Sequence, residues 1–195
     1  MGQYYQPCVL NEEKTRVISA TNPLSWDSGM KLMEHSYYGV DVVRAAVELL
    51  KTKYNGYRFV WAGDYADENA DGKNFYVMAC DKDLFKFEEE LETTSEPCPW
   101  DKSQKVYSLP EPFGEAKYLL NYDKKVAVEL VPDEESEWPI HPLPLLTAES
   151  NGKGGGDYFS EVNASLVGSW KYDHLGAADE VPEGFEVETA IFRED

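Results

Sequence analysis

The chain has 195 residues, of which 37 are acidic and 18 are basic, so its formal net charge at pH 7 is −19. A surface of this charge repels nucleic acid and anionic membranes, so we expect neither as a direct partner, and it attracts basic proteins or cations. A hydrophobic fraction of 42% and an aromatic fraction of 13% are enough for a packed core, which excludes a disordered chain.

Hydropathy and cysteine content predict a cytoplasmic location. No apolar run approaches the roughly 18 residues that span a bilayer, and strand-like sequence stands where a secretory leader would begin. The three cysteines, Cys8, Cys80 and Cys98, are widely spaced and include no C-x-x-C pair. This spacing argues against a disulfide framework and a cysteine zinc site, and it fits reduced thiols, with Cys80 expected in a buried strand.

The first third of the chain predicts strands around one helix. Residues 4–10 and 15–20 are expected to form two strands. Between residues 41 and 54 apolar side chains recur at helical spacing, which predicts the principal helix, and Asp41 is placed to cap it. Residues 57–62 are rich in β-forming side chains and predict the next strand.

The middle of the chain alternates acidic loops with short elements. An acidic stretch, 63–74, leads to a β-rich run at 75–80, which we expect to be a strand. Residues 84–91 predict a short acidic helix. Residues 117–121 and 126–131 flank a turn-forming sequence and predict a hairpin.

The C-terminal part predicts two final strands, at 166–172 and 185–192. In the second, two-residue alternation places Phe185, Val187, Thr189 and Ile191 on one face of the strand. The fold expected for the whole chain is therefore α+β: a mostly antiparallel sheet with one principal helix (about 41–54) and long ordered loops. We interpret residues 1–195 as a single domain.

Residues 67–72 match the opening of a calcium loop, with oxygen ligands at alternate positions and a glycine for the turn. The match fails at the twelfth position, where Met78 replaces the bidentate Glu, so an EF-hand is excluded. A loose acidic hairpin loop is the favoured interpretation. A different divalent-cation site using Asp64, Asp67 or Asp71 stays open.

Residues 151–158 form a glycine-rich segment without the order of a phosphate-binding loop, because Lys153 precedes the glycines and no Ser or Thr follows it. Three consecutive glycines cost backbone entropy and have no obvious structural need, but they let a ligand approach the backbone closely. A flexible surface loop and a ligand-binding loop are both compatible with the sequence. Asp157 is expected to belong to the site, whereas Asp64 is expected to be structural.

Aromatic and histidine residues add little evidence for catalysis. Trp61 stands beside a glycine at a strand end, where it either closes the core or stacks on a ligand. His35, His141 and His174 are scattered and lack metal-binding spacing, and His35 is expected to be structural. No nucleophile elbow occurs. The candidate ligand-binding residues are Trp61, Asp64, Asp67, Asn151, Gly154, Gly155, Gly156, Asp157 and Tyr158.

Several segments together resemble a family of small uncharacterised proteins found in bacterial genomes, prophages and phages. The resemblance is carried by MGQYY (1–5), GMKLMEHS (29–36), AGDYAD (62–67), PLLTA (144–148), NGKGGGDY (151–158) and VGSW (167–170). It implies no established activity. It does imply a phage or mobile-element setting, where small acidic proteins often block host enzymes or immune proteins.

Charge and resemblance lead to one main hypothesis: a phage-type acidic protein that inhibits a host nucleic-acid-binding or immune protein, in an anti-CRISPR-like role, by occupying its basic site. Carboxylates can take the place of phosphates on Lys and Arg clusters. The expected partner-binding residues are Glu88, Glu89, Glu90, Asp133, Glu134, Glu135, Glu186 and Glu188.

The alternative hypothesis is a small-molecule or nucleotide-binding protein, or a metal-assisted nucleotide hydrolase. It would use Asp64, Asp67 and Asp157 for a metal and the backbone of 154–156 for phosphate. No cofactor is expected beyond a possible divalent cation, and the sequence does not identify a metal site.

Overall fold

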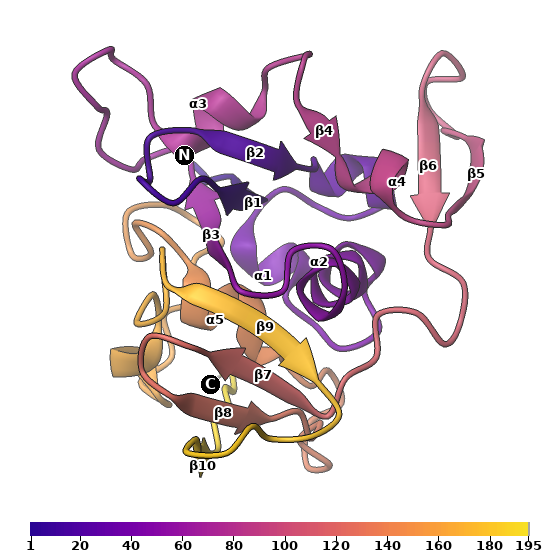
Figure 1. Cartoon of the computed structure of the whole chain (residues 1–195). Helices are drawn as coiled ribbons and strands as arrows, with labels where there is room; N and C mark the ends of the chain where they lie inside the picture. Colours follow the sequence, from indigo (N-terminus) through magenta and orange to yellow (C-terminus); the bar gives the residue numbers. More distant parts are fainter. Residues whose placement is uncertain (195) are drawn as a thin grey trace.

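The frame of the molecule is an eight-stranded sheet, seen in the computed structural model, which describes residues 1–194 (Figure 1). Its strands, in chain order, are β1 (Tyr5–Leu10), β2 (Val17–Ala20), β3 (Tyr57–Gly63), β4 (Phe85–Lys86), β7 (Tyr118–Asn121), β8 (Val126–Glu129), β9 (His174–Ala178) and β10 (Glu186–Glu188). The spatial order is β10-β8-β7-β9-β3-β1-β2-β4. Chain-distant strands therefore meet in the middle of the sheet, where β9 pairs with β3.

Most strand pairs are antiparallel, and the two parallel pairs, β2 with β4 and β8 with β10, lie at the two edges. A separate two-stranded antiparallel hairpin consists of β5 (Thr94–Pro97) and β6 (Lys105–Ser108). The expected α+β fold with a mostly antiparallel sheet is confirmed, as are the strand pair β1–β2 and the hairpin β7–β8.

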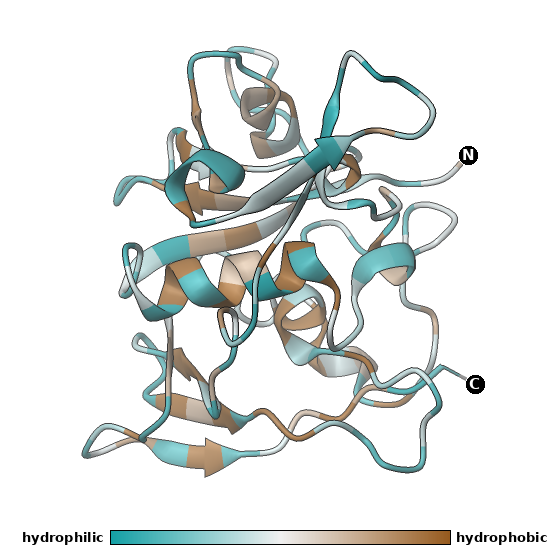
Figure 2. Ribbon diagram, turned by 90° about the vertical axis from the view of Figure 1, so that its right-hand side faces the viewer, coloured by the Kyte–Doolittle hydropathy of each residue, from teal (hydrophilic) through white to brown (hydrophobic). Residues whose placement is uncertain are grey.

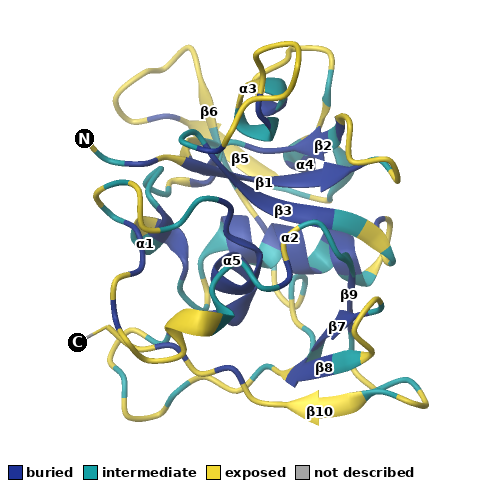
Figure 3. Ribbon diagram, turned by 90° about the vertical axis from the view of Figure 1, so that its left-hand side faces the viewer, coloured by how far each residue is buried: buried dark blue, intermediate teal, exposed yellow. Residues whose placement is uncertain are grey.

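The principal helix, α2 (Asp41–Lys51), packs against the concave side of the sheet, with α5 (Pro142–Thr147) beside it (Figure 3). Its apolar side chains are buried, and its polar ones alternate with them along the ribbon (Figure 2). Asp41 is the first helical residue rather than the cap, which is Val40. The Asp41 carboxylate instead accepts hydrogen bonds from Arg44 and from the backbone N–H of Leu109.

Both faces of the central strands are buried. In β3, Phe59 and Trp61 join the larger core with α2 and α5, whereas Val60 and Ala62 face a smaller cluster on the other side. Helix α3 (Phe75–Ala79) covers that second face. Because successive side chains of a strand point to opposite faces, burial on both sides requires the nearly continuous apolar sequence that β3 has.

The strand expected at 75–80 is wrong, because these residues form α3. Asn74 caps the helix by accepting a hydrogen bond from the N–H of Val77 at 2.9 Å. Cys80, expected in a buried strand, is exposed at the end of this helix. A side-chain cap and packing on the sheet outweigh the β propensity of the segment.

The C-terminal strand predictions are also corrected. Residues 166–172 form no strand: a short 3-10 helix, η2 (Ala164–Leu166), leads into turns in which Gly168 and Tyr172 have positive φ. The strand starts after them, as β9. Of residues 185–192 only β10 is a strand, and the expected alternation fails, because Val187 and Ile191 are exposed whereas Phe192 is buried.

The remaining elements are short. The acidic helix expected at 84–91 divides into β4 and a one-turn helix, α4 (Phe87–Glu90). The sequence pattern did not predict α1 (Leu32–His35), the 3-10 helix η1 (Pro23–Trp26) or α5. None of the helices within residues 1–194 has the length and apolarity needed to cross a membrane.

Candidate functional site

Asp157 organises the glycine-rich loop. One carboxylate oxygen, Oδ2, accepts hydrogen bonds from the backbone N–H groups of Gly152, Lys153 and Gly154 at 2.7, 2.9 and 3.1 Å. The other, Oδ1, accepts from the Tyr5 hydroxyl at 2.9 Å. Asp157 is buried, and its acceptor capacity is thus used inside the protein.

Two of the three glycines have a structural need, contrary to the expectation. A Cβ on Gly154 would lie 2.5 Å from the side chain of Gln3, and one on Gly156 would lie 2.3 Å from that of Lys31. Gly155 forms a bridge with Gly2, and a Cβ there would make only ordinary contacts, at 3.8 Å. The loop therefore packs against the N-terminal segment, and its backbone is occupied by the protein's own chain, which explains Gly154 and Gly156 without a ligand.

The other ligand-binding candidates also have partners. Trp61 is fully buried and donates its indole N–H to His35 Nε2 at 2.7 Å, which supports the core interpretation for both residues. Burial lowers the pKa of His35 to about 4, so its ring is neutral at pH 7. Asp64 accepts from the N–H of Tyr4 at 2.9 Å.

Asn151 and Tyr158 close the base of the loop. The Asn151 side chain accepts from the Tyr158 N–H at 2.9 Å and donates to the Tyr158 carbonyl at 3.0 Å. Of the nine predicted ligand residues, only Asp67 lines the pocket described next.

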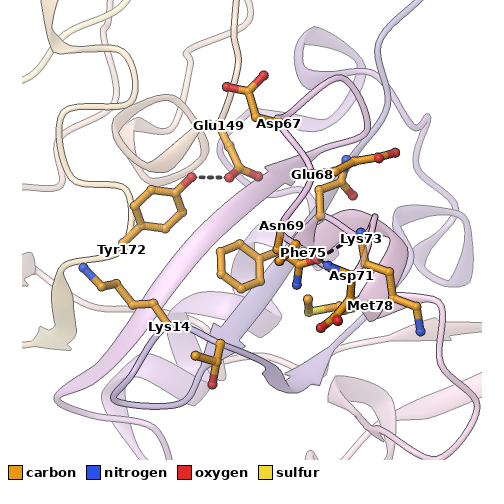
Figure 4. A pocket seen from close by; sticks show the side chains of 13 residues that line it. Lys14, Asp67, Glu68, Asn69, Asp71, Lys73, Phe75, Met78, Glu149 and Tyr172 are labelled. Carbon is orange, nitrogen blue, oxygen red and sulfur yellow. Dashed lines mark hydrogen bonds between the residues drawn. The ribbon is translucent and has the colours of Figure 1, made fainter.

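A pocket of about 490 Å³ lies between the loop that precedes α3 and the turns that precede β9 (Figure 4). Lys14, from the β1–β2 turn, lines one side. The loop supplies Asp67, Glu68 and Asp71, and α3 supplies Phe75 and Met78. Two more residues, Glu149 and Tyr172, come from distant parts of the sequence.

Glu149 is the unusual group of this pocket. It is 93% buried, since only 7% of its surface is exposed, and the Tyr172 hydroxyl donates to Glu149 Oε1. The second oxygen, Oε2, is buried and has no hydrogen-bond partner among the described residues. Burial, with a smaller contribution from the charge of Asp67, raises the pKa of Glu149 above its usual value. A buried acceptor without a donor costs free energy, so it marks a position where a ligand could supply one.

Aromatic rings stand beside this carboxyl group. The Phe75 and Tyr172 rings contact each other with centroids 5.8 Å apart and planes inclined by 59°. In Figure 4 the Glu149 carboxyl group points into the space between them and the Asp67 loop. The pocket thus combines an acidic group at its base with apolar walls.

The acidic residues expected to bind a partner fall into two groups. Glu88 and Glu90 are turned into the protein: Glu88 accepts from Thr21, and Glu90 accepts from Ser19, Lys53 and Tyr54. Burial raises the pKa of Glu88. These two carboxylates attach α4 to β2 and α2, so only Glu89 of this run is exposed.

The loop 133–138 presents most of its acids to solvent. Asp133 is held by two hydrogen bonds from Arg193, which lower the pKa of Asp133. Glu134 and Glu135 are exposed. Trp138, at the end of the loop, is 68% exposed and lines a depression of about 350 Å³ together with Glu137, Glu194 and Arg193.

The edge strand β10 presents Glu186 and Glu188. Both side chains are exposed, and the strand pairs on one side only, with β8 (Figure 3). Neither carboxylate forms an ion pair with a described residue. The predicted partner-binding acids that are exposed and form no ion pair with a described residue are therefore Glu89, Glu134, Glu186 and Glu188, whereas Glu135 pairs with Arg193 at 3.0 Å.

Sequence reasoning missed Glu149, Tyr172 and Phe75. Phe75 was assigned to a strand, although Asn74 directly before it is a helix-capping signal. Tyr172 was assigned to a strand too, and no local pattern distinguishes Glu149 from the other acids. Within residues 1–194, no group of three or more His, Cys, Asp or Glu side chains is arranged to hold a metal ion.

No family model, curated protein or solved structure matches the chain, so the interpretation of these surfaces depends on their own geometry and charge.

Proposed function

We propose that this protein is an acidic interaction protein of the cytoplasm that occupies a basic, nucleic-acid-binding site on a host protein. In its concrete form this is a phage-encoded, anti-defence inhibitor, acting on an immune protein in the manner of an anti-CRISPR. The observation that carries the proposal is the exposed Trp138 among the carboxylates of the loop 133–138 and of Glu194, of which Asp133 and Glu135 pair with Arg193 and the others form no ion pair with a described residue.

Trp138 and its acidic neighbours fit the chemistry of a basic partner. Tryptophan is enriched among the few residues that dominate binding energy, and its ring face attracts Arg and Lys side chains. Carboxylates around it bind guanidinium and ammonium groups by charge-assisted hydrogen bonds. With 37 acids against 18 bases, many carboxylates on this surface cannot be neutralised within the chain.

Strand β10 supports the same proposal. Glu186 and Glu188 are two residues apart on one strand, which places them about 7 Å apart on one face. This spacing is of the same order as that of successive phosphates along a nucleic-acid strand. A basic groove that follows phosphates is therefore able to follow this strand edge.

The test starts with affinity capture of partners from a bacterial lysate, followed by binding measurements on the purified partner. We expect Trp138→Ala to weaken binding at least tenfold. Trp100→Ala is the matched control, because Trp100 is also exposed, at 77%, but lies in the β5–β6 connection away from the acidic loop. Equal effects of the two variants, or none from Trp138→Ala, would contradict the proposal.

The charge contribution is tested separately. Glu186→Gln/Glu188→Gln should weaken binding of the same partner several-fold at low salt and less at high salt, because counterions screen exposed charges. Glu96→Gln/Glu161→Gln removes the same charge at exposed positions elsewhere and should have a smaller effect. A complex that is insensitive to salt would contradict the proposed charge mimicry.

The alternative, a nucleotide-binding protein or metal-assisted nucleotide hydrolase, receives less support. Asp157 and Asp64 accept hydrogen bonds from backbone N–H groups, and the 154–156 backbone packs against the N-terminal segment. Neither Asp64 nor Asp157 lines the pocket beside Asp67. The observation that favours a ligand site concerns Glu149 instead, and its chemistry differs from phosphate binding.

A further inference from the structure

The pocket beside α3 contains a hydrogen-bond acceptor that the protein does not satisfy. Glu149 is held in place from two sides: its N–H donates to the Trp61 carbonyl at 2.9 Å, and its Oε1 accepts from Tyr172. Oε2 is buried and has no hydrogen-bond partner of normal geometry among the described residues, although the backbone N–H of Gly63 is close enough to the carboxyl group to offset part of the rise in its pKa. The side chain is therefore fixed in position, and the group that completes its hydrogen bonding must bring an N–H or O–H.

The walls favour a flat or cationic group. Phe75 and Tyr172 contribute ring surfaces, and Met78 adds a polarisable side chain. The Lys171 Nζ lies over the Tyr172 ring, 5.9 Å from its centre, so this ring already accommodates a cation on its face. Planar cations gain both stacking and electrostatic attraction on such surfaces.

The charges around the pocket favour a cationic ligand. Asp67, Glu68 and Asp71 line the pocket together with Glu149, against Lys14 and Lys73. In Figure 4 the ammonium groups of the two lysines lie on opposite outer sides, whereas the Glu149 carboxyl group is at the inner end. An anionic ligand at the inner end of the pocket would have to approach the buried carboxyl group of Glu149, away from the two lysines, so the pocket disfavours phosphates.

We propose that this pocket binds a guanidinium group, with Glu149 Oε2 accepting its N–H donors and the Phe75 and Tyr172 rings contacting its plane. A guanidinium is planar, permanently charged and rich in donors, which matches the acceptor, the rings and the acidic rim together. The group can come from a small guanidino compound or from an arginine side chain of a protein. The inference stands apart from the proposed function, since it concerns neither Trp138 nor β10.

Calorimetric titrations of the full chain with four probes distinguish a small guanidino compound from an arginine side chain and show whether the charge of the guanidinium is needed. Agmatine represents the small molecule, and a terminally blocked Ala-Arg-Ala peptide represents the protein side chain. Their isosteric controls, in which a neutral urea group replaces the guanidinium, are N-carbamoylputrescine, which keeps the ammonium group of agmatine, and the blocked Ala-citrulline-Ala peptide. We expect at least one guanidinium probe to bind at least tenfold more tightly than its urea control. Equal binding of both members in each pair, or no binding by any probe, would overturn the proposal.

Variants locate the binding. Glu149→Gln keeps an acceptor for Tyr172 and removes the charge, so the fold should be retained and binding should weaken at least tenfold. Asp67→Asn changes a fully exposed rim residue, carries no folding risk and should weaken binding two- to threefold. Glu188→Gln removes the same charge from β10 and should leave the affinity unchanged. An unchanged affinity in Glu149→Gln would overturn the assignment even if a probe binds elsewhere.

The pH dependence gives a second readout. Burial raises the pKa of Glu149, and its polar neighbours are Tyr172, Lys171, the backbone N–H of Gly63 and Asp67. The charge of Glu149 also helps to raise the pKa values of Tyr5 and Cys8, on β1. Because a protonated carboxyl group holds a cation weakly, affinity should fall as the pH falls through the pKa of Glu149. This fall should be much smaller in Glu149→Gln; an identical pH profile in both proteins would contradict the proposed role.

The experiments distinguish failure of the guanidinium-pocket proposal from failure of the proposed function. A host partner that still binds Glu149→Gln but not Trp138→Ala would leave the acidic-surface proposal intact. Guanidinium probes that bind while no host partner is sensitive to Trp138→Ala would leave only the pocket proposal.

Discussion

At the scale of single residues, carboxylates of the same type have different roles according to what surrounds them. Asp157 accepts four hydrogen bonds inside the protein, Asp64 accepts one from the Tyr4 N–H, and Asp67 is fully exposed. Sequence patterns had grouped the three as ligand candidates. The donors that reach each carboxylate separate them: Asp157 has three within its own loop and one on β1, and Asp64 has one from the N-terminal segment.

Asp157→Ala should lower the free energy of unfolding by about 3 kcal/mol, because three backbone N–H groups and the Tyr5 hydroxyl lose their acceptor. Asp64→Ala, the matched control, should cost about 1 kcal/mol. Urea unfolding of both variants measures the difference. Equal losses in the two proteins would show that Asp157 is not the residue that organises the loop.

His174 should make stability depend on pH. Partial burial lowers its pKa, but hydrogen bonds to Glu12 and Asp123 outweigh this effect and raise the pKa above the usual value. Because the folded-state pKa is the higher one, the stabilisation is present below about pH 6.5 and is lost as the pH rises through the folded-state value. The site is partly exposed, so the effect should stay below about 1 kcal/mol.

The check for His174 is urea unfolding between pH 5 and 9, compared with His174→Gln. The difference between the two proteins should be largest at the acidic end. A difference in unfolding free energy that grows as the pH rises would contradict a stabilising role of protonated His174 with Glu12 and Asp123.

At the scale of elements, the sequence predicted those whose signal is local. Helix α2 was found from its periodicity, and β7–β8 from the turn between two apolar runs. Helix α3 was missed, because capping by Asn74 overrides the β-like composition of 75–80. Strand β9 was missed, because pairing with β3 places the strand after the apparent one at 166–172. The pocket was missed for the same reason: Phe75, Glu149 and Tyr172 meet only in the folded chain.

Helix α4 should depend on Glu90 and not on Glu89. Glu90 accepts from Ser19, Lys53 and Tyr54, whereas Glu89 is exposed. Glu90→Ala should therefore lower the free energy of unfolding by about 2 kcal/mol, and Glu89→Ala by less than about 0.5 kcal/mol. Thermal or urea unfolding of this adjacent pair gives the comparison, and equal stabilities would contradict the inward role of Glu90.

Arg44 attaches the loop 109–114 to α2. Its guanidinium donates to the carbonyls of Leu109 and Phe113 at 2.9 and 2.7 Å and forms an ion pair with Asp41 at 2.7 Å. Lysine cannot reproduce this fork of donors, so Arg44→Lys should cost about 2 kcal/mol. Lys53→Arg, the reverse exchange at a half-exposed position, should be nearly neutral, because arginine can still reach Glu90. Proteolytic cleavage within the loop 109–114 should be faster in Arg44→Lys than in the unmodified protein and unchanged in Lys53→Arg.

At the scale of the whole molecule, the charge of −19 has a consequence that does not require a partner. Repulsion among exposed carboxylates destabilises the compact state, and salt screens it. The melting temperature should therefore rise by several degrees between about 20 mM and 500 mM NaCl. A melting temperature that falls with salt would mean that the ion pairs outweigh the repulsion. Composition predicted this property directly, whereas the positions of the available acids required the fold.

The central claim is that the acidic surface takes the place of a nucleic acid on its partner. Its most direct test is competition on the captured partner between this protein and a DNA duplex, measured by displacement at constant salt. We expect DNA to displace the protein to an extent set by the affinity of the DNA for the partner, and to displace Trp138→Ala at a lower DNA concentration. A ternary complex of partner, protein and DNA, with the affinity for the protein unchanged, would contradict it.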